Sequence, residues 1–547
     1  MRKAHTASAL ALAVCVSVAC SSQDDLTQSH PDTSPETSEL TDSVSPIDSS
    51  APDASDTGAS DSGASDSGAP IDSTLPDTND AADVAEADAP KVGIYIDAVH
   101  GHDDTGDGSY GRPFLTVSKG GSAATKSGQT IYAFPGKYPL EVVAVTLVDG
   151  VGVEALTYGT VTFGYGPATG NSYGLTFKGS GFVHGIAMDR AFINVSAGTV
   201  TLDGVQSGGL GDPGSSGASA VNVSGTGKVV ITPGGLTNYI VPGLASFADL
   251  RDAGQLEVRG GAFVGAGGNT FDAAGLFNLA GTSKLLLDGV TIDNGKTGAV
   301  QYGDTSSVTL QGGTLIRNCA QTSGLLRQTI NSNHGSPTLV MDNATITGSP
   351  YDGVTLNVGS ATPSITLRNG AVIEKSARDG IVTAGTLTLD NARVSDNGGT
   401  GVDLESGTLI TSAGTVIRNN AQGINLRLAS AYTLTMRNTQ VINNTRGGLV
   451  VAYAEGGTFD LGTAASIGGN TFKGNGTNVT FSGGLSTADL VVNAVGNTWD
   501  ATANGADSTG HFPASTTFVA PPSVSGTNVN LVQGGAAAHH VSLVAAP

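Results

Sequence analysis

A short motif that recurs every 22 to 31 residues constrains what this chain can fold into more than any other feature. The motif reads apolar, any residue, apolar, polar, then Asn or Gly, as in "LLLDG" at Leu285 and "ITLRN" at Ile365. Its copies, of which the second and ninth are degenerate, begin at Val200, Val229, Leu256, Leu285, Val308, Leu339, Ile365, Leu387, Leu409 and Leu434. A period of this length built from short segments is typical of a solenoid, in which each coil completes its core against its neighbours.

Two further columns share this period. An aliphatic residue stands three positions after the Asn or Gly, and a Gly-aliphatic pair such as Gly353-Val354 or Gly380-Ile381 follows it. Three short strands per coil of variable length predict an all-β fold, a right-handed parallel β-helix (solenoid). A β-propeller would need a unit of about 40 or more residues, and a left-handed β-helix would show a hexapeptide period.

The Asn and Gly that end the motif predict a tight turn. Gly and Asn tolerate positive φ better than other residues. Asn343, Asn369, Asn391 and Asn438 are therefore expected at equivalent turns, with their amides about 4.8 Å apart and able to form a hydrogen-bonded ladder. The preceding residues alternate in charge, which favours mutual neutralisation over a substrate-binding stripe.

The N-terminus reads as an export signal. Residues 1–19 combine Arg2 and Lys3 with an apolar stretch that is too short to span a bilayer. The residues Ser17-Val18-Ala19-Cys20 resemble the lipobox of bacterial lipoproteins, with Ser17 where Leu is preferred. The resemblance implies acylation of Cys20 and a membrane as partner; an ordinary cleavage after Ala19 is the alternative. Ser21 lacks the aspartate that retains some lipoproteins at the inner membrane, which favours the outer membrane or cell surface.

Residues 20–91 predict a disordered linker. Residues 21–90 contain 14 Asp, 3 Glu, no Lys or Arg and no aromatic residue. Such a segment buries too little apolar surface to fold. It supplies most of the formal net charge of −22, and an acidic domain on an acidic linker argues against nucleic acid as a partner. We expect a monomer.

The segment after the linker carries a family resemblance. "IYIDAVHGHDDTGDGSYGRPFLTVSKG" and "GQTIYAFPGKYP", within residues 94–139, resemble the N-terminal segment, of unknown function, of a bacterial family of right-handed β-helix proteins in the pectate-lyase-like superfold. The resemblance implies a capping segment with a short helix at residues 92–150, coils at 151–510 and a closing segment at 511–547. It is specific for the fold and weak for function, because this superfold hosts lyases, hydrolases, epimerases and adhesins.

The coils offer few candidate chemical groups. Arg378, Asp379, Arg393, Asp396 and Asp403 come from adjacent coils and could share a face as a substrate site, although solvated turns explain them as well. No dense acidic cluster is evident in the sequence, so no catalytic residue is assigned. Analogy with the enzymes of this superfold nevertheless keeps a carbohydrate-active enzyme (polysaccharide lyase or glycoside hydrolase) acting on an acidic polysaccharide as the alternative function.

The stretch "HGHDDTGDG" contains Asp103, Asp104 and Asp107. Aspartates at this density could bind Ca²⁺, but the spacing does not match an EF-hand loop and no Glu follows. A structural turn, in which Asp caps N–H groups and Gly takes positive φ, explains the same residues. No other cofactor is expected. The sequence therefore predicts an exported, lipid-anchored β-helix with a non-catalytic binding or structural role towards a glycan or cell-surface partner.

Overall fold

The computed structural model has two units, residues Met1–Ala85 and Glu86–Pro547. The predicted signal peptide, Cys20 and nearly all of the predicted linker lie outside the described residues. Described are residues 90–140, 144–165, 174–189, 191–207, 219–232, 246–264, 275–294, 298–319, 328–332, 334–356, 362–412, 414–427, 432–451, 457–482, 490–499, 516–518, 529–532 and 541–544.

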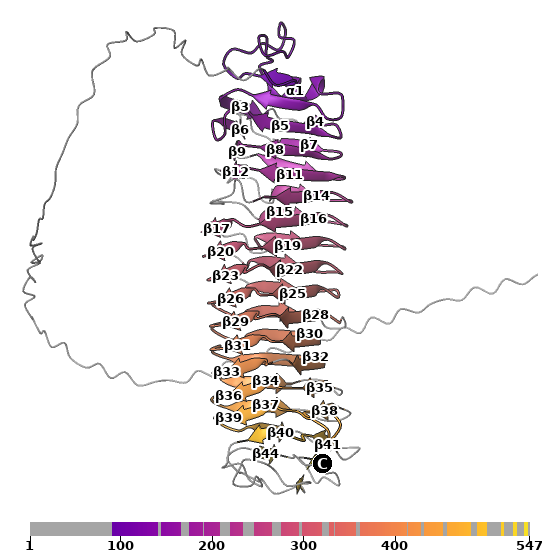
Figure 1. Cartoon of the computed structure of the whole chain (residues 1–547), viewed down its shortest axis with the longest axis vertical. Helices are drawn as coiled ribbons and strands as arrows, with labels where there is room; N and C mark the ends of the chain where they lie inside the picture. The colour runs from indigo at the N-terminus through magenta and orange to yellow at the C-terminus, as the bar shows by residue number, and fades with distance from the viewer. Residues whose placement is uncertain are drawn as a thin grey trace, which may run out of the picture. The chain divides into compact units, whose positions relative to one another are not determined.

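The second unit is a parallel β-solenoid, as the motif period predicts (Figure 1). Each full coil contributes strands to three faces, which we call faces I, II and III. Every named strand except β43 (Thr516–Phe518) pairs in parallel with the same face of a neighbouring coil, and β43 pairs antiparallel with β45 (Val541–Val544).

Face I contains the repeated motif. Its strands are β1 (Ile94–Ile96), β2 (Thr130–Ala133), β5 (Val151–Ala155), β8 (Gly181–His184), β11 (Thr199–Asp203), β14 (Lys228–Ile231), β16 (Gln255–Arg259), β19 (Lys284–Asp288), β22 (Ser307–Gln311), β25 (Thr338–Asp342), β28 (Ser364–Arg368), β35 (Tyr432–Met436), β38 (Thr458–Asp460), β41 (Leu490–Asn493) and β45 (Val541–Val544). Two long strands, β30 (Ile381–Asp390) and β32 (Thr400–Ser412), run from face II onto face I without a break, where the sequence predicts separate short strands.

Face II precedes face I in each coil. Its strands are β4 (Val145–Leu147), β7 (Gly174–Phe177), β10 (Phe192–Val195), β13 (Ser219–Val223), β15 (Ser246–Leu250), β18 (Phe277–Leu279), β21 (Val300–Tyr302), β24 (Ile330–Ser332), β27 (Val354–Leu356), β34 (Gln422–Leu426), β37 (Gly447–Val451), β40 (Val479–Ser482) and β44 (Val529–Val532), with the first parts of β30 and β32.

Face III follows face I in each coil and is made of two sheets. The first contains β3 (Gly136–Leu140), β6 (Val161–Tyr165), β9 (Ile186–Asp189) and β12 (Gln206–Ser207). The second contains β17 (Ala262–Val264), β20 (Thr291–Asp293), β23 (Leu315–Arg317), β26 (Thr345–Thr347), β29 (Val372–Glu374), β31 (Arg393–Ser395), β33 (Val416–Arg418), β36 (Gln440–Ile442), β39 (Thr471–Lys473) and β42 (Thr498–Trp499).

Apolar side chains from all three faces meet in one continuous core. Leu285 and Leu287 pair with Val308 and Leu310 of the next coil, and all four are almost completely buried. Burial of a side chain of this size contributes about 1.5–3 kcal/mol, so the stacked coils hold together along their whole length. Cys319 and Trp499 also belong to this core, and Trp499 stacks on Phe472 with 4.6 Å between ring centroids.

The N-terminal end of the stack is closed by the helix α1 (Val117–Ala123). Thr116 is its N-cap and accepts a hydrogen bond from the Lys119 backbone N–H. Gly120 and Gly121 bring the helix directly onto Ile96 and Val145, since a Cβ atom at either glycine would lie within 2.7 Å of those side chains. The helix thus covers the first coils, as the resemblance implies. No helix among the described residues is long and apolar enough to cross a membrane.

The four turn asparagines between faces I and III have positive φ. Their φ angles are 51° at Asn343, 56° at Asn369, 51° at Asn391 and 49° at Asn438. No hydrogen bond between two of these four amides is found in the described part of the chain; instead, Asn369 Nδ2 donates to Asp342 Oδ1 at 2.8 Å. The amide ladder that the sequence suggests is therefore not formed at this turn.

A different asparagine ladder runs through the turn between faces III and II. It joins four buried side chains in successive coils, Asn397, Asn420, Asn444 and Asn475, through Nδ2–Oδ1 distances of 2.9 Å, 3.1 Å and 2.9 Å. Each oxygen also accepts a backbone N–H of the preceding coil, for example that of Asn397 at Asn420. These side chains satisfy the backbone where the chain turns inside the core, as buried polar groups must be.

Candidate functional site

A column of polar side chains runs along the outer surface of face II. These residues occupy equivalent positions by strand register and alternate with the inward core residues. In chain order they are Thr146, Thr176, Asn194, Asn222, Asp249, Asn278, Gln301, Asn331, Thr355, Val382, Asp403 and Asn425. All but Val382 can form hydrogen bonds, and the set ends where the next position in register is Val450. We call this set the face II column.

Several members of the column are buried although they point away from the core. Asn331 and Val382 are each 7% exposed, and Asp403 is 3% exposed. Outward positions on a solvated sheet are ordinarily exposed, so these three side chains are packed against their neighbours. Asp403 lies in a group of charged residues, where Asn425 and Arg427 of the next coil contact it.

That group, which we call the carboxylate–arginine cluster, is built first at the turn that enters face II. Asp352 and Asp379 occupy the same turn position in successive coils, directly before Gly353-Val354 and Gly380-Ile381. Asp352 Oδ1 accepts the backbone N–H of Asp379 at 3.1 Å, and Asp379 Oδ1 accepts that of Thr400 at 2.6 Å. Each carboxylate thus anchors the next coil through its backbone.

Arg378 lies between these two carboxylates. Its guanidinium is 3.9 Å from Asp352 Oδ1 and 3.8 Å from Asp379 Oδ2. It also lies over the ring of Tyr351, 4.1 Å from the ring centroid. The cation–π contact and both ion pairs fix the guanidinium above the turn.

The remainder of the cluster lies on the strand surface. Asp403 projects outward from β32, and Arg427, just after β34, places Nη2 3.2 Å from Asp403 Oδ2 and 2.7 Å from Glu405 Oε1. Asn425 Nδ2 donates to Asp403 Oδ1 at 3.3 Å. The cluster therefore contains Asp352, Asp379, Asp403, Glu405, Arg378 and Arg427, four acids against two bases.

Two carboxyl groups of the cluster have raised pKa values. Burial raises the pKa of Asp352 to about 6, against hydrogen bonds from Asp379 N–H and Thr355, and the negative charge of Asp379 adds to the rise. Burial likewise raises the pKa of Asp403 to about 6, with Arg427 opposing and the charges of Asp379 and Glu405 adding. Asp379 therefore lies within electrostatic reach of both groups.

Three of the five residues predicted for a substrate face belong to this cluster: Arg378, Asp379 and Asp403. The other two do not share the face. Arg393 starts β31 on face III and pairs with Glu374 at 2.8 Å. Asp396 follows β31 and accepts Asn419 Nδ2 at 2.9 Å. Arg393 and Asp396 lie at the face III side of the turn, whereas Asp379 lies at its face II side, so membership of adjacent coils does not suffice to bring residues together.

Sequence reasoning missed the rest of the cluster. Asp352 had a visible signal, because "YDGV" and "RDGI" align in the Gly-aliphatic column. The sequence carries no such signal for Arg427 and Glu405, because their contact depends on the strand register. The face II column was also missed, because the face II strands carry no motif as regular as that of face I.

The aspartates of the N-terminal loop act as hydrogen-bond acceptors. Asp103 accepts the backbone N–H groups of Leu115 and Thr116 and the Thr116 hydroxyl, at 2.8, 3.1 and 2.8 Å. Asp107 accepts Ser109 N–H at 3.0 Å and lies 3.3 Å from Arg112. Asp104 is exposed nearby. No group of three metal-ligating side chains occurs within the described residues.

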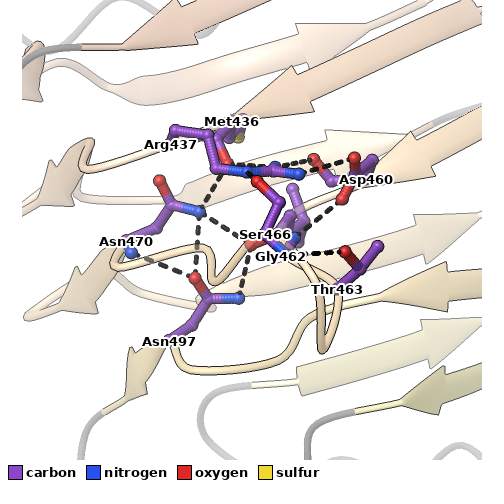
Figure 2. A network of polar contacts seen from close by, with 9 residues as sticks. Met436, Arg437, Asp460, Gly462, Thr463, Ser466, Asn470 and Asn497 are labelled. Carbon is purple, nitrogen blue, oxygen red and sulfur yellow. Dashed lines mark hydrogen bonds and ion pairs between the residues drawn. The ribbon is translucent and has the colours of Figure 1, made fainter. Parts of the chain in front are cut away.

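A second polar group, near the C-terminal end, has a structural role (Figure 2). Arg437 donates to Ser466 Oγ at 2.9 Å and pairs with Asp460 at 2.7 Å, which holds the loop that follows β38. Below it, Asn470 Nδ2 donates to Asn497 Oδ1 at 2.9 Å and to two backbone carbonyls at 3.0 Å. These side chains hydrogen-bond to one another and to the backbone. The carboxylate–arginine cluster is therefore the candidate site.

Comparisons with known proteins address the fold. Residues 276–506 match the family model of the right-handed β-helix region. This segment contains the carboxylate–arginine cluster and lies within the observed stack of coils. The solenoid is accordingly a right-handed parallel β-helix, as the sequence predicts. No curated protein matches the chain.

Several solved structures are similar at low identity. The periplasmic alginate epimerase AlgG is 12% identical over 74% of this chain and 79% of its own, with a TM-score of 0.32. The A-module of the Azotobacter vinelandii mannuronan C-5 epimerase AlgE6 is 12% identical over 79% and 94%, with a TM-score of 0.26. The lacto-N-biosidase of Eubacterium ramulus is 11% identical over 71% and 63%, with a TM-score of 0.18. Similarity this low bears on no question of activity.

Proposed function

We propose that this chain is an exported lipoprotein, acylated at Cys20, whose β-helix binds a glycan along face II. The signal-like residues 1–19 and the acidic, charge-repelling residues 21–90 support a domain held away from a membrane surface. The outer membrane or cell surface is the location that Ser21 favours. The binding role is non-catalytic and the protein is a monomer.

The face II column is the observation that carries this proposal. Sugars are recognised through many hydroxyl groups, and side-chain amides, carboxylates and hydroxyls supply the matching donors and acceptors. From Thr176 to Gln301, where its side chains are partly exposed, the column presents such groups at intervals of about 4.8 Å. An extended polysaccharide lying along the solenoid could contact one side chain per coil, so many weak contacts would add up.

Binding can be tested with a panel of immobilised neutral and acidic polysaccharides. We expect the wild-type protein to bind at least one of them, and Asn222→Ala with Gln301→Ala to weaken that binding roughly fivefold per lost hydrogen bond. The matched controls are Thr309→Ala and Thr366→Ala, which change outward side chains of face I. Equal loss in both sets, or no binding by the wild type, would count against the proposal.

A second candidate function is a carbohydrate-active enzyme acting on an acidic polysaccharide. The cluster favours it, because general acid catalysis near neutral pH requires a carboxyl group whose pKa is raised, as at Asp352 and Asp403. Incubation with uronate polymers, followed by the absorbance of unsaturated products and by reducing ends, tests it. Turnover that disappears in Asp379→Asn would establish the enzyme and displace the non-catalytic proposal.

The lipid anchor has its own test. A Cys20→Ser variant should appear in the soluble fraction and lack the mass of the acyl chains, whereas the wild type should fractionate with the membrane. A mature wild-type chain that begins after Ala19 with an unmodified cysteine would show ordinary signal cleavage instead.

A further inference from the structure

We infer that the carboxylate–arginine cluster makes the affinity of face II for anionic glycans depend on pH. Face II binds these glycans tightly under acidic conditions and weakly at neutral pH. The inference rests on the proposed glycan-binding function and adds to it the ligand class and its regulation.

The charge inventory of the cluster supports this. Asp352 faces Asp379 and Arg378, and Asp403 faces Arg427, Glu405 and Asp379. With all four acids ionised, the cluster has two more negative than positive charges. Both guanidinium groups are then occupied by protein carboxylates, so a ligand carboxylate meets net repulsion.

Protonation of Asp352 and Asp403 removes that excess. The pKa of each is raised to about 6, so acidification from pH 7.5 to pH 5 neutralises both, while a uronate on the ligand stays largely ionised. Arg427 then keeps its contact with Glu405, and Arg378 keeps its contact with Asp379. Each arginine has lost one competing carboxylate and can pair with the ligand.

Linkage fixes the sign of the effect and relates its size to the change in pKa on binding. If a bound anion replaces repulsion with attraction, it raises the pKa values of Asp352 and Asp403, and protonation strengthens anion binding by the same factor. A combined rise of about one pH unit corresponds to about tenfold tighter binding in acid. Complex formation near pH 6 must then take up protons.

The experiment compares a galacturonate oligomer with its fully methyl-esterified, uncharged form on the wild-type chain at pH 5 and pH 7.5. We expect about tenfold tighter binding of the acidic form at pH 5, and no comparable change for the ester. Calorimetry at pH 6 in buffers of different ionisation enthalpy should show proton uptake with the acidic oligomer only. The calorimetric measurement needs no variant and so does not depend on one folding.

Two variants locate the effect. Asp403→Asn and Asp352→Asn should each bind the acidic oligomer more tightly than wild type at pH 7.5 and show a smaller pH dependence. Asp342→Asn, which removes a carboxylate paired with Arg368 at the turn after face I, is the control and should behave as wild type. Binding of the acidic form that is independent of pH, or proton release in its place, would overturn the inference but leave glycan binding intact. Failure of both forms to bind, with no other glycan bound, would remove the proposed function itself.

Discussion

Asn444 accepts two hydrogen bonds from Asn420 of the preceding coil on the same side-chain oxygen, one from the backbone N–H at 3.0 Å and one from Nδ2 at 3.1 Å. Asn444 repeats the arrangement towards Asn475, at 3.0 Å and 2.9 Å. The amide is suited to this role because it is both a donor and an acceptor. A carboxylate of the same size could not continue the ladder in both directions, because it only accepts hydrogen bonds.

Asn444→Ala should be strongly destabilising. The substitution leaves two donors of Asn420 without an acceptor inside the core, and each such group costs about 1–3 kcal/mol. We expect a loss of about 2–5 kcal/mol, a lower thermal unfolding midpoint, and faster hydrogen exchange of the Asn420 amide. The control is Asn443→Gly, at the exposed adjacent position with a φ of 55°, which should change stability by less than about 0.5 kcal/mol. Equal effects would mean that the turn, and not the ladder, determines stability.

Asn391 tests the turn between faces I and III separately from any hydrogen bond. Its φ is 51° and the side chain is exposed. A residue with a Cβ atom and no compensating side chain pays about 1–2 kcal/mol in this conformation, so Asn391→Ala should destabilise by about 1 kcal/mol. Asn391→Gly should be neutral or slightly stabilising by denaturant unfolding. If Asn391→Ala had the same stability as the wild type, the backbone of the turn would have to move out of the positive-φ conformation at no cost.

Positions that repeat locally were predictable. Leu285, Leu287 and Asn391 recur at the coil period, and one buried face plus one positive φ per coil determines the solenoid. The buried ladder also repeats, in "DN" at 396, "NN" at 419 and 443 and "GN" at 474. The ladder was not predicted, because an asparagine next to a turn is ordinarily exposed to solvent. These asparagines become buried only when the coils stack on one another.

The candidate site was predictable only in part. Asp379 and Asp403 lie on neighbouring coils. They come close together because Asp379 directly precedes a face II strand and Asp403 lies on the next one. Arg393 and Asp396 lie as near in sequence, yet they fall beyond a corner. The contact of Arg427 with Asp403 and Glu405 depends on which residue of β34 pairs with which of β32, and coil lengths that vary by several residues hide that register.

The N-terminal loop is expected to be indifferent to Ca²⁺. Asp107 already accepts Ser109 N–H and pairs with Arg112, and Asp103 caps the segment leading to α1. Millimolar Ca²⁺ should therefore shift the melting temperature of the wild type and of Asp107→Ala equally. A gain that occurs only in the wild type would reveal a bound ion. Asp103→Ala should lower stability with or without Ca²⁺, because three hydrogen bonds are lost.

Asp352 should make the protein less stable at neutral pH than in mild acid. Its pKa in the folded chain is about 6, above the usual value of 3.8. Between these values the folded state binds more protons than the unfolded state, so stability falls as pH rises. The full penalty, roughly 3 kcal/mol for a shift of this size, is present above pH 6 and absent below about pH 4.

Asp352→Asn should remove that penalty while its side-chain oxygen still accepts the Asp379 N–H. We therefore expect the variant to be more stable than wild type at pH 7.5 and similar to it at pH 4, measured by urea unfolding at both values. Asp342→Asn provides the contrast: Asn369 and Arg368 hold the pKa of Asp342 below its usual value, so its loss should cost stability at neutral pH. If Asp352→Asn were instead destabilising at pH 7.5, the ion pair with Arg378 would outweigh the burial of the charge.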